Sequence, residues 1–277
     1  MNNFHNIDAK DHHILYSLQI TRSVLGYYAH QEELKKLRNT DHKRLLRYGY
    51  KVFSQSDEDG IIEEIFKRIG INAATFIEFG VGNGIESNTS KLLIDSWKGL
   101  WIESDANSIK YIQQNILPFY NDKLVVKEAK VTAENINGLI SESVDGMVDL
   151  LSIDIDYNDY WVWKAIDIIK PRVVVIEYNS SFPPPLSLTV PYDPKAEWDV
   201  SNYYGASLEA LVKLGYQKGY KIVGCNYSGI NAFFVREDLT KDRFIEPATS
   251  EEHYEPPRYY FPMLSGHGPR MGPFVKV

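Results

Sequence analysis

A glycine-rich turn near residue 80 is the first stretch of the chain that could bind a ligand. In segment 75–84, an apolar run leads into the carboxylate of Glu78 and then into three glycines at alternate positions. Glycines allow backbone angles and close approaches that a side chain would prevent. Residues 85 and 86 are Ile and Glu rather than the Lys-Ser or Lys-Thr pair of a P-loop, so the turn does not predict a phosphate cradle. The glycines are Gly80, Gly82 and Gly84.

A second carboxylate lies at the sequence spacing expected of a residue that binds a ribose. Glu103 ends the apolar run 99–103 and lies 23 residues after Gly80. In dinucleotide-binding units, an acidic residue about 20 residues after the first glycine ends the second strand and binds the ribose hydroxyls. The alternative is a surface carboxylate at a strand end. The turn itself leaves NAD, flavin and S-adenosylmethionine (SAM) as candidate ligands.

Several acidic and amide side chains follow two later apolar runs, 148–154 and 173–177. Because the carboxyl ends of neighbouring parallel strands share one crevice, we expect these side chains to converge there. Clustered acids repel one another unless a cation neutralises them, and an all-oxygen set suits Mg²⁺, Mn²⁺ or Ca²⁺ rather than zinc. The group contains Asp154, Asp156, Asn158, Asp159, Glu177 and Asn179, of which the predicted metal ligands are Asp154, Asp156, Glu177 and Asn179.

A role without metal is equally compatible with this pattern. Asp154 would then hydrogen-bond the backbone or SAM, while Asp156 and Asp159 would only cap the helix that follows. If the strand continues through both Asp154 and Asp156, their side chains point the same way, because side chains alternate along a strand.

The elements that position these residues follow from short, continuously apolar runs, which are typical of parallel strands buried on both faces. Helical patterns occupy the gaps, and runs 220–226 and 231–236 flank a short turn that predicts a β-hairpin. The predicted fold is α/β, a doubly wound Rossmann-like sheet that is mostly parallel and has a terminal antiparallel hairpin. The predicted parallel strands are 75–79, 99–103, 124–129, 148–154 and 173–177.

Three further segments surround this sheet. Residues 1–50 predict a helical appendage that packs on the core or on a second subunit, with a homodimer through the N-terminal helices as one outcome. Residues 51–240 form the ligand-binding domain, and the Pro-rich, aromatic stretch 180–205 within it predicts a lid loop. Residues 241–277 are expected to form a tail near the active site. The aromatic residues of the loop include Tyr192, Trp198, Tyr203 and Tyr204.

Composition narrows the class of protein. The 277 residues carry a net charge of −7 and a mean hydropathy of −0.31, which argues against a nucleic-acid-binding protein. No apolar run approaches the ~20 residues of a membrane span, and the start is unlike a signal peptide. The single cysteine, Cys225, excludes an intramolecular disulfide. We therefore expect a cytoplasmic protein without a membrane span.

These motifs together resemble the FkbM-related members of the class I SAM-dependent methyltransferases, which often accompany bacterial polysaccharide gene clusters. The resemblance covers about residues 50–240. It rests on Ser54-Gln55, Glu78-Phe-Gly-Val-Gly82, Gly99-Leu-Trp-Ile-Glu103, the stretch 153–163 and Val175-Ile-Glu-Tyr-Asn179. The class I sheet ends in an antiparallel pair, as the hairpin predicts here, and NAD-binding Rossmann domains generally do not.

The resemblance implies particular roles for residues of this chain. Glu78, Gly80 and Gly82 would surround the methionine part of SAM, and Glu103 would bind the ribose. Ser104 would lie beside the ribose. The remaining residues expected at the cofactor are Gln55, Ala129, Lys130 and Asp154, with Ala129 and Lys130 flanking the adenine.

The resulting hypothesis is a SAM-dependent O-methyltransferase that acts on a sugar or nucleotide-linked sugar of a bacterial capsular polysaccharide, with Mg²⁺ or Mn²⁺ as a candidate second cofactor. Such an enzyme must align an acceptor oxygen with the methyl carbon and remove its proton, and the candidate bases are Asp156, Asp159 and His267. Two alternatives remain. One is an NAD-linked oxidoreductase, and the other is a non-catalytic carbohydrate-binding protein with a Rossmann-like core.

Overall fold

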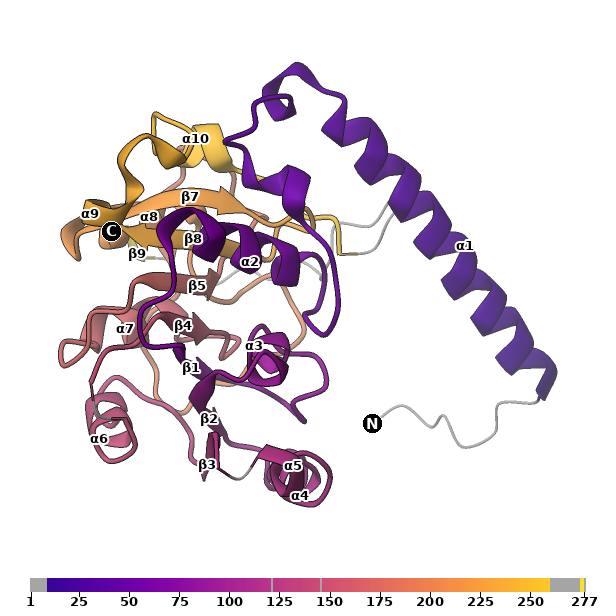
Figure 1. The fold of residues 1–277 in the computed structure, drawn as a ribbon. Coiled ribbons are helices and arrows are strands. Elements are labelled where there is room, and N and C mark those ends of the chain that lie inside the picture. Colours follow the sequence, from indigo (N-terminus) through magenta and orange to yellow (C-terminus); the bar gives the residue numbers. More distant parts are fainter. Residues whose placement is uncertain (1–8, 121, 145, 260–274, 277) are drawn as a thin grey trace.

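The protein is built on one twisted seven-stranded sheet, shown in the computed structural model of Figure 1. The structure describes residues 9–120, 122–144, 146–259 and 275–276. The strand order is β3-β2-β1-β4-β5-β8-β7, and β8 pairs antiparallel with both of its neighbours. The predicted fold class, mostly parallel with a terminal hairpin, is confirmed. The strands are β1 Thr75–Phe79, β2 Lys98–Glu103, β3 Leu124–Glu128, β4 Leu150–Ile153, β5 Val173–Glu177, β7 Tyr220–Cys225 and β8 Asn231–Arg236.

Helices cover both faces of this sheet, which explains the continuously apolar strands. In β1, Phe76 packs with α2 and α3 on one face, while Ile77 and Phe79 pack with α6, α7 and α8 on the other. The helices of the first face are α2 Glu58–Ile69, α3 Ser90–Ile94 and α4 Ala106–Asn115, followed by the short α5 Leu117–Tyr120. Those of the second face are α6 Ile136–Ser141, α7 Asp159–Ala165 and α8 Leu208–Gln217.

The segments outside the sheet are arranged as follows. The N-terminal helix α1, Ala9–Leu34, extends away from the body and meets it only near its C-terminal end (Figure 1). The strand β6, Leu188–Thr189, lies in the aromatic loop and pairs with β9, Val275–Lys276. None of the described helices has the length and apolar character needed to cross a membrane. The remaining elements are the short helices η1 Leu37–Asn39, η2 Leu45–Tyr48, α9 Glu237–Thr240, η3 Lys241–Arg243 and α10 Ser250–His253.

One of the predicted boundaries that differ from the structure bears directly on the acidic residues. The fourth strand was expected to reach Asp154, but β4 ends at Ile153. Asp156 then adopts a positive φ of 65°, which turns the chain away from the strand direction. The helix α7, which follows this turn, ends at Ala165, since Ile166 has an extended backbone. The expectation that Asp154 and Asp156 share a strand and a direction therefore does not apply.

The glycine turn is shaped by one close approach. Gly80 has a φ of +74°, and a Cβ atom on it would lie 1.6 Å from the backbone oxygen of Asp154. Gly82 also has a positive φ, +53°, but no atom lies within 4 Å of the place its Cβ would take. The positive φ therefore favours glycine at both positions, but only at Gly80 would a side chain also collide with a neighbouring atom.

This difference gives a stability prediction. Gly80→Ala should lower the free energy of unfolding by about 3 kcal/mol or more, because it adds a steric overlap to the cost of a left-handed backbone. Gly82→Ala, the matched control, should lower the free energy of unfolding by only about 1–2 kcal/mol, because it places a side chain on a left-handed backbone without a steric overlap. Urea denaturation of both variants measures the difference. Equal losses would contradict the contact with Asp154.

Candidate active site

The end of β2 is tied directly to the glycine turn. Glu103 is 9% exposed, and its Oε2 accepts a hydrogen bond from the Gly82 amide at 2.8 Å. Its Oε1 accepts from the amides of Ser104 and Asp105, at 2.7 and 2.8 Å. The carboxylate of Glu103 is thus held at a fixed place beside the turn, where its remaining lone pairs can meet a ligand.

A cavity of about 450 Å³ lies over this carboxylate. We call it the smaller cavity. Of the nine residues predicted at the cofactor, seven line it: Gly80, Gly82, Glu103, Ser104, Ala129, Lys130 and Asp154. They come from the ends of four strands, β1 to β4, which the parallel sheet brings to one edge. The Lys130 ammonium also donates to the backbone oxygen of Lys195 at 3.2 Å, which links this edge to the aromatic loop.

Glu78 and Gln55, the other two predicted cofactor residues, lie elsewhere. Glu78 is 3% exposed, and its carboxylate accepts hydrogen bonds from the amides of Asn88 and Thr89 at 2.9 and 3.1 Å. Burial raises its pKa, while these donors oppose the shift. Glu78 therefore fixes the start of α3 behind the turn and lines neither cavity of the site. Gln55 lines a second, larger cavity.

The acidic cluster forms at the carboxyl edge, with a membership that differs from the prediction. Asp154, Asp159 and Glu177 each place one carboxylate oxygen so that all three oxygens lie within 4.8 Å of one another. Asp159 Oδ1 accepts from the Ile155 amide at 2.9 Å, but its buried Oδ2 has no hydrogen-bond partner. The buried Oε2 of Glu177 also has none. Two of the three converging carboxylates, those of Asp159 and Glu177, therefore each have one oxygen without a hydrogen-bond partner.

The pKa values of these carboxyl groups reflect this crowding. Burial raises the pKa of Asp154 well above its usual range, and the charges of Asp156 and Asp159 add to the effect. Burial, followed by the charge of Asp154, likewise raises the pKa of Glu177 well above its usual range. Burial raises the pKa of Asp159 to about 7. Three neighbouring carboxylates can all stay ionised only if a positive charge compensates them.

The two other predicted metal ligands are placed differently. Asn179 donates from Nδ2 to the backbone oxygens of Asn202 and Tyr204, at 2.8 and 3.0 Å, and its Oδ1 accepts from the Ser181 amide at 3.1 Å. Its amide therefore braces the aromatic loop. Asp156 is exposed and outside the cluster of three, yet it lines both cavities. His267, a predicted base, lies outside the described residues.

The larger cavity, of about 1010 Å³, adjoins the smaller one, since both are lined by Asp154, Asp156 and Trp198. Of the aromatic-loop residues named from the sequence, Trp198 and Tyr204 line it, whereas Tyr192 and Tyr203 do not. Glu177 lies in the same wall. The cavity is rich in aromatic side chains contributed by several segments: Tyr27, Tyr50, Trp198, Tyr204, Tyr227 and Tyr259.

Sequence reasoning missed one wall of this cavity. The last turns of α1 contribute Tyr27, His30 and Leu34, and the segment after α10 contributes Arg258 and Tyr259. These segments are more than 200 residues apart in the chain. No motif in either of them signals the contact, which depends on ion pairs between charged residues of ordinary surface type.

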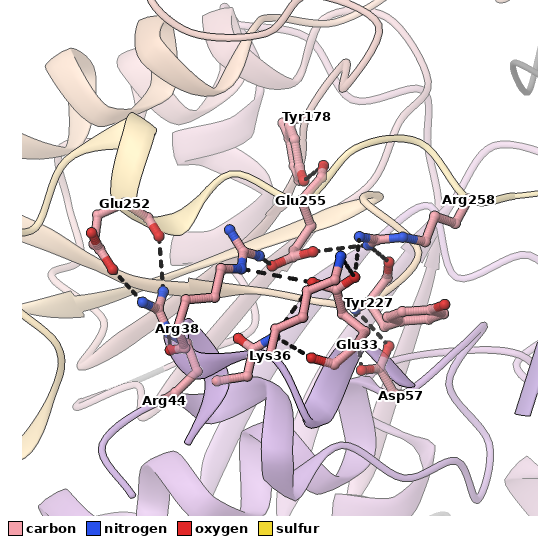
Figure 2. Close-up of polar contacts among 11 residues, drawn as sticks. Glu33, Lys36, Arg38, Arg44, Asp57, Tyr178, Tyr227, Glu252, Glu255 and Arg258 are labelled. Atoms are coloured by element: carbon pink, nitrogen blue, oxygen red, sulfur yellow. Dashed lines mark hydrogen bonds and ion pairs between the residues drawn. The ribbon is translucent and has the colours of Figure 1, made fainter. Parts of the chain in front are cut away.

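Figure 2 shows the ion pairs that hold this wall together. Glu255, 3% exposed, forms ion pairs with two arginines. One is Arg38, which follows α1, and the other is Arg258, at 2.8 Å. Glu33 on α1 lies 2.6 Å from Lys36 and 3.6 Å from Arg258. Burial alone would raise the pKa of Glu33, but Lys36 and Arg258 lower it below its usual value. Two buried carboxylates and their cations thus fasten the end of α1 to the C-terminal segment.

The edges of both cavities are therefore suited to different ligands. The smaller cavity offers a carboxylate, held in place by backbone amides, for ribose hydroxyls. The larger one offers aromatic faces and acidic oxygens, a combination that suits polyhydroxylated rings. Because the two share Asp154 and Asp156, groups bound in each would meet at the acidic cluster.

Comparison with known proteins adds only distant likenesses. No protein-family model and no curated protein matches the chain. Among solved structures, StiE O-MT is 11% identical, with 59% of this chain and 51% of that chain covered and a TM-score of 0.36. The chain thus spans about half the length of that solved chain, which comprises residues 942–1257 of its protein.

Two further similar structures are covered more completely. The precorrin-6y C5,15-methyltransferase of Geobacter metallireducens is 13% identical, with 68% of this chain and 90% of that chain covered and a TM-score of 0.39. A SAM-dependent methyltransferase of Clostridium acetobutylicum is 13% identical, with 76% and 98% covered and a TM-score of 0.39. At this degree of likeness, function has to be inferred from the geometry of the chain itself.

One buried acid in the wall of the larger cavity gives a pH prediction. Asp57 accepts a hydrogen bond from the Tyr227 amide at 3.1 Å, and burial next to Glu58 raises its pKa to about 7. The folded state thus keeps a proton that the unfolded chain loses near pH 4, so stability from this group is present below pH 4 and is lost as the pH rises toward 7. Asp57→Asn keeps an acceptor oxygen but cannot ionise.

The Asp57→Asn variant should therefore gain stability relative to the wild type as the pH rises. We expect the difference in the free energy of unfolding to grow by roughly 1–3 kcal/mol between pH 5 and pH 8, measured by urea denaturation at both values. Groups that do not interact with Asp57 titrate alike in both proteins and cancel in this difference. A difference that is independent of pH would show that Asp57 is ionised throughout.

Proposed function

We propose that this protein is a SAM-dependent methyltransferase that transfers a methyl group to a hydroxyl of a carbohydrate acceptor. The observation that supports it most is the position of Glu103. Its carboxylate is bonded to Gly82 in a cavity that adjoins a second, acid-lined and aromatic cavity. A cofactor site and an acceptor site that meet at one boundary are what a group transfer requires.

The topology favours SAM over NAD. The strand β8 runs antiparallel between β5 and β7, as in the class I methyltransferases that the sequence motifs resemble. The unsatisfied carboxylates of Asp159 and Glu177 argue against a purely carbohydrate-binding protein, because burying such groups is costly and binding a glycan does not need them. The resemblance to FkbM-related enzymes further supports an acceptor in bacterial surface polysaccharide synthesis, such as a sugar or nucleotide-linked sugar.

The residues of the chain would divide the work as follows. Glu103 and Ser104 would bind the ribose, while Ala129 and Lys130 would flank the adenine. Bound SAM would supply the reactive methyl group. Asp156, exposed and lining both cavities, is well placed to accept the proton of the acceptor hydroxyl, and the aromatic side chains would orient the sugar face. Asp159 is a less suitable base, because one of its oxygens is engaged by the Ile155 amide.

A divalent cation fits the acidic cluster. Asp154, Asp159 and Glu177 converge, and both Asp159 and Glu177 have one buried carboxylate oxygen without a hydrogen-bond partner. A hard cation such as Mg²⁺ or Mn²⁺ takes oxygen ligands of this kind. These three residues would hold the ion, in place of the set that included Asp156 and Asn179. When bound, such an ion lowers the pKa of a coordinated hydroxyl and gathers acceptor oxygens.

The cofactor assignment can be tested by calorimetry with S-adenosylhomocysteine. The wild-type protein should bind it, and Glu103→Ala should weaken binding at least about tenfold, because charged hydrogen bonds to the ribose are lost. Glu128→Ala is the matched control, since Glu128 ends the neighbouring strand β3, is exposed and lines neither cavity. Absence of binding to the wild type, or equal binding by Glu103→Ala, would contradict the proposal.

The metal assignment predicts that Mn²⁺ binds the protein without any acceptor. Asp159→Asn and Glu177→Gln should each weaken Mn²⁺ binding at least about tenfold, as measured by titration calorimetry, because each removes an ionised ligand. Glu86→Gln serves as the control. Glu86 lines the larger cavity, as Glu177 does, but is paired with Lys51 at 2.9 Å. If Mn²⁺ does not bind the wild type, the cluster is structural or serves SAM alone.

A further inference from the structure

The helix α1 presents apolar side chains that no other described part of the chain covers. Among the described residues, α1 does not pack along any helix or strand of the body. Its side chains are markedly exposed, with 52% for Ile14, 60% for Leu18, 43% for Leu25 and 63% for Tyr28. Isolated helices are only marginally stable in water, and most helices in proteins are stabilised by packing one face. A covering surface would therefore stabilise α1.

The exposed apolar residues form a regular seam. Ile14, Leu18, Thr21, Leu25 and Tyr28 follow one another at spacings of four, three, four and three residues, which is the heptad pattern of a coiled coil. We call these five residues the α1 seam. Thr21 at its centre donates its hydroxyl to the Ser17 backbone oxygen at 2.9 Å, so its polar atom is already satisfied within the helix.

The α1 seam and the larger cavity use different faces of the helix. Tyr27, His30 and Leu34 line the cavity, and none of the seam residues does. With about 100° of rotation per residue, the seam points roughly opposite to these three side chains. A partner could therefore cover the seam and leave the cavity accessible.

The seam is complementary to itself when the second helix runs in the opposite direction. Pairing Thr21 with Thr21 of a second copy places Ile14 opposite Tyr28, and Leu18 opposite Val24 and next to Leu25. The same register places position 10, a lysine, opposite position 32, a glutamate. Between residues 12 and 31 the sequence contains a single charged residue, Arg22, so the paired segment carries few charges.

We propose that two copies of this chain form a dimer through antiparallel pairing of their α1 seams. This arrangement has the twofold symmetry of most homodimers, because one patch meets the same patch of the second copy. The ion pairs of Glu33 and Glu255 hold the end of α1 on the body, so the dimer contact would also fix the wall of the larger cavity in each copy. The dimer does not depend on whether SAM binds.

Light scattering coupled to gel filtration tests the dimer. The wild type should elute with about twice the mass of the 31.8 kDa chain, and the double variant Leu18→Glu/Leu25→Glu with the mass of one chain. Leu37→Glu, which changes an 87% exposed leucine outside the seam, should remain dimeric. A cooperative thermal transition of the double variant would show that its body is folded. A monomeric wild type, or a dimeric double variant, would overturn the proposal. Binding of a monomeric wild type to lipid vesicles would assign the seam to a membrane surface instead.

Cross-linking tests the direction of the helices, because the only native cysteine, Cys225, is buried. Oxidised Thr21→Cys should form a disulfide-linked dimer, since the two copies of this residue meet at the twofold axis. Oxidised Ile14→Cys should not, because antiparallel pairing separates the two copies of this residue by about 20 Å. Cross-linking of both variants would indicate parallel helices, and cross-linking of neither would exclude the seam as the interface.

Discussion

The close contact between Gly80 and the backbone oxygen of Asp154 is the constraint on which the candidate site depends. It brings the turn after β1 against the chain that leaves β4, at a separation that no side chain could occupy. On one side of this contact, the Gly82 amide meets Glu103 and completes the smaller cavity. On the other side, Asp154 reaches Asp159 and Glu177. The predicted cofactor residues and the acidic cluster are therefore joined through the contact between Gly80 and Asp154.

The features that could be predicted from the sequence are those with local causes. Short continuous apolar runs are specific for strands buried on both faces, so the runs at 75–79 and 173–177 appear as β1 and β5 with the predicted bounds. The hairpin of β7 and β8 follows from two apolar runs around a short turn. Glu103 could be found because its spacing from Gly80 reflects the length of one strand-helix-strand unit.

The features that sequence reasoning missed depend on contacts between distant segments or on single backbone angles. Glu78 was expected at the ligand, but its oxygens are taken by the amides that begin α3. The strand β4 ends at Ile153, and Asp156, which has a positive φ, lies outside the acidic cluster. Glu33 and Arg258 look like ordinary surface charges in the sequence, yet they join α1 to the C-terminal segment and build a wall of the larger cavity (Figure 2). No spacing rule relates residues so far apart.

The most direct test of a shared transfer centre is a crystal structure of the protein with bound S-adenosylhomocysteine. We expect the adenosine in the smaller cavity, with the ribose hydroxyls on Glu103 and the sulfur at the boundary formed by Asp154, Asp156 and Trp198, facing the larger cavity. A sulfur atom directed away from that boundary, or a ligand bound outside the smaller cavity, would contradict it.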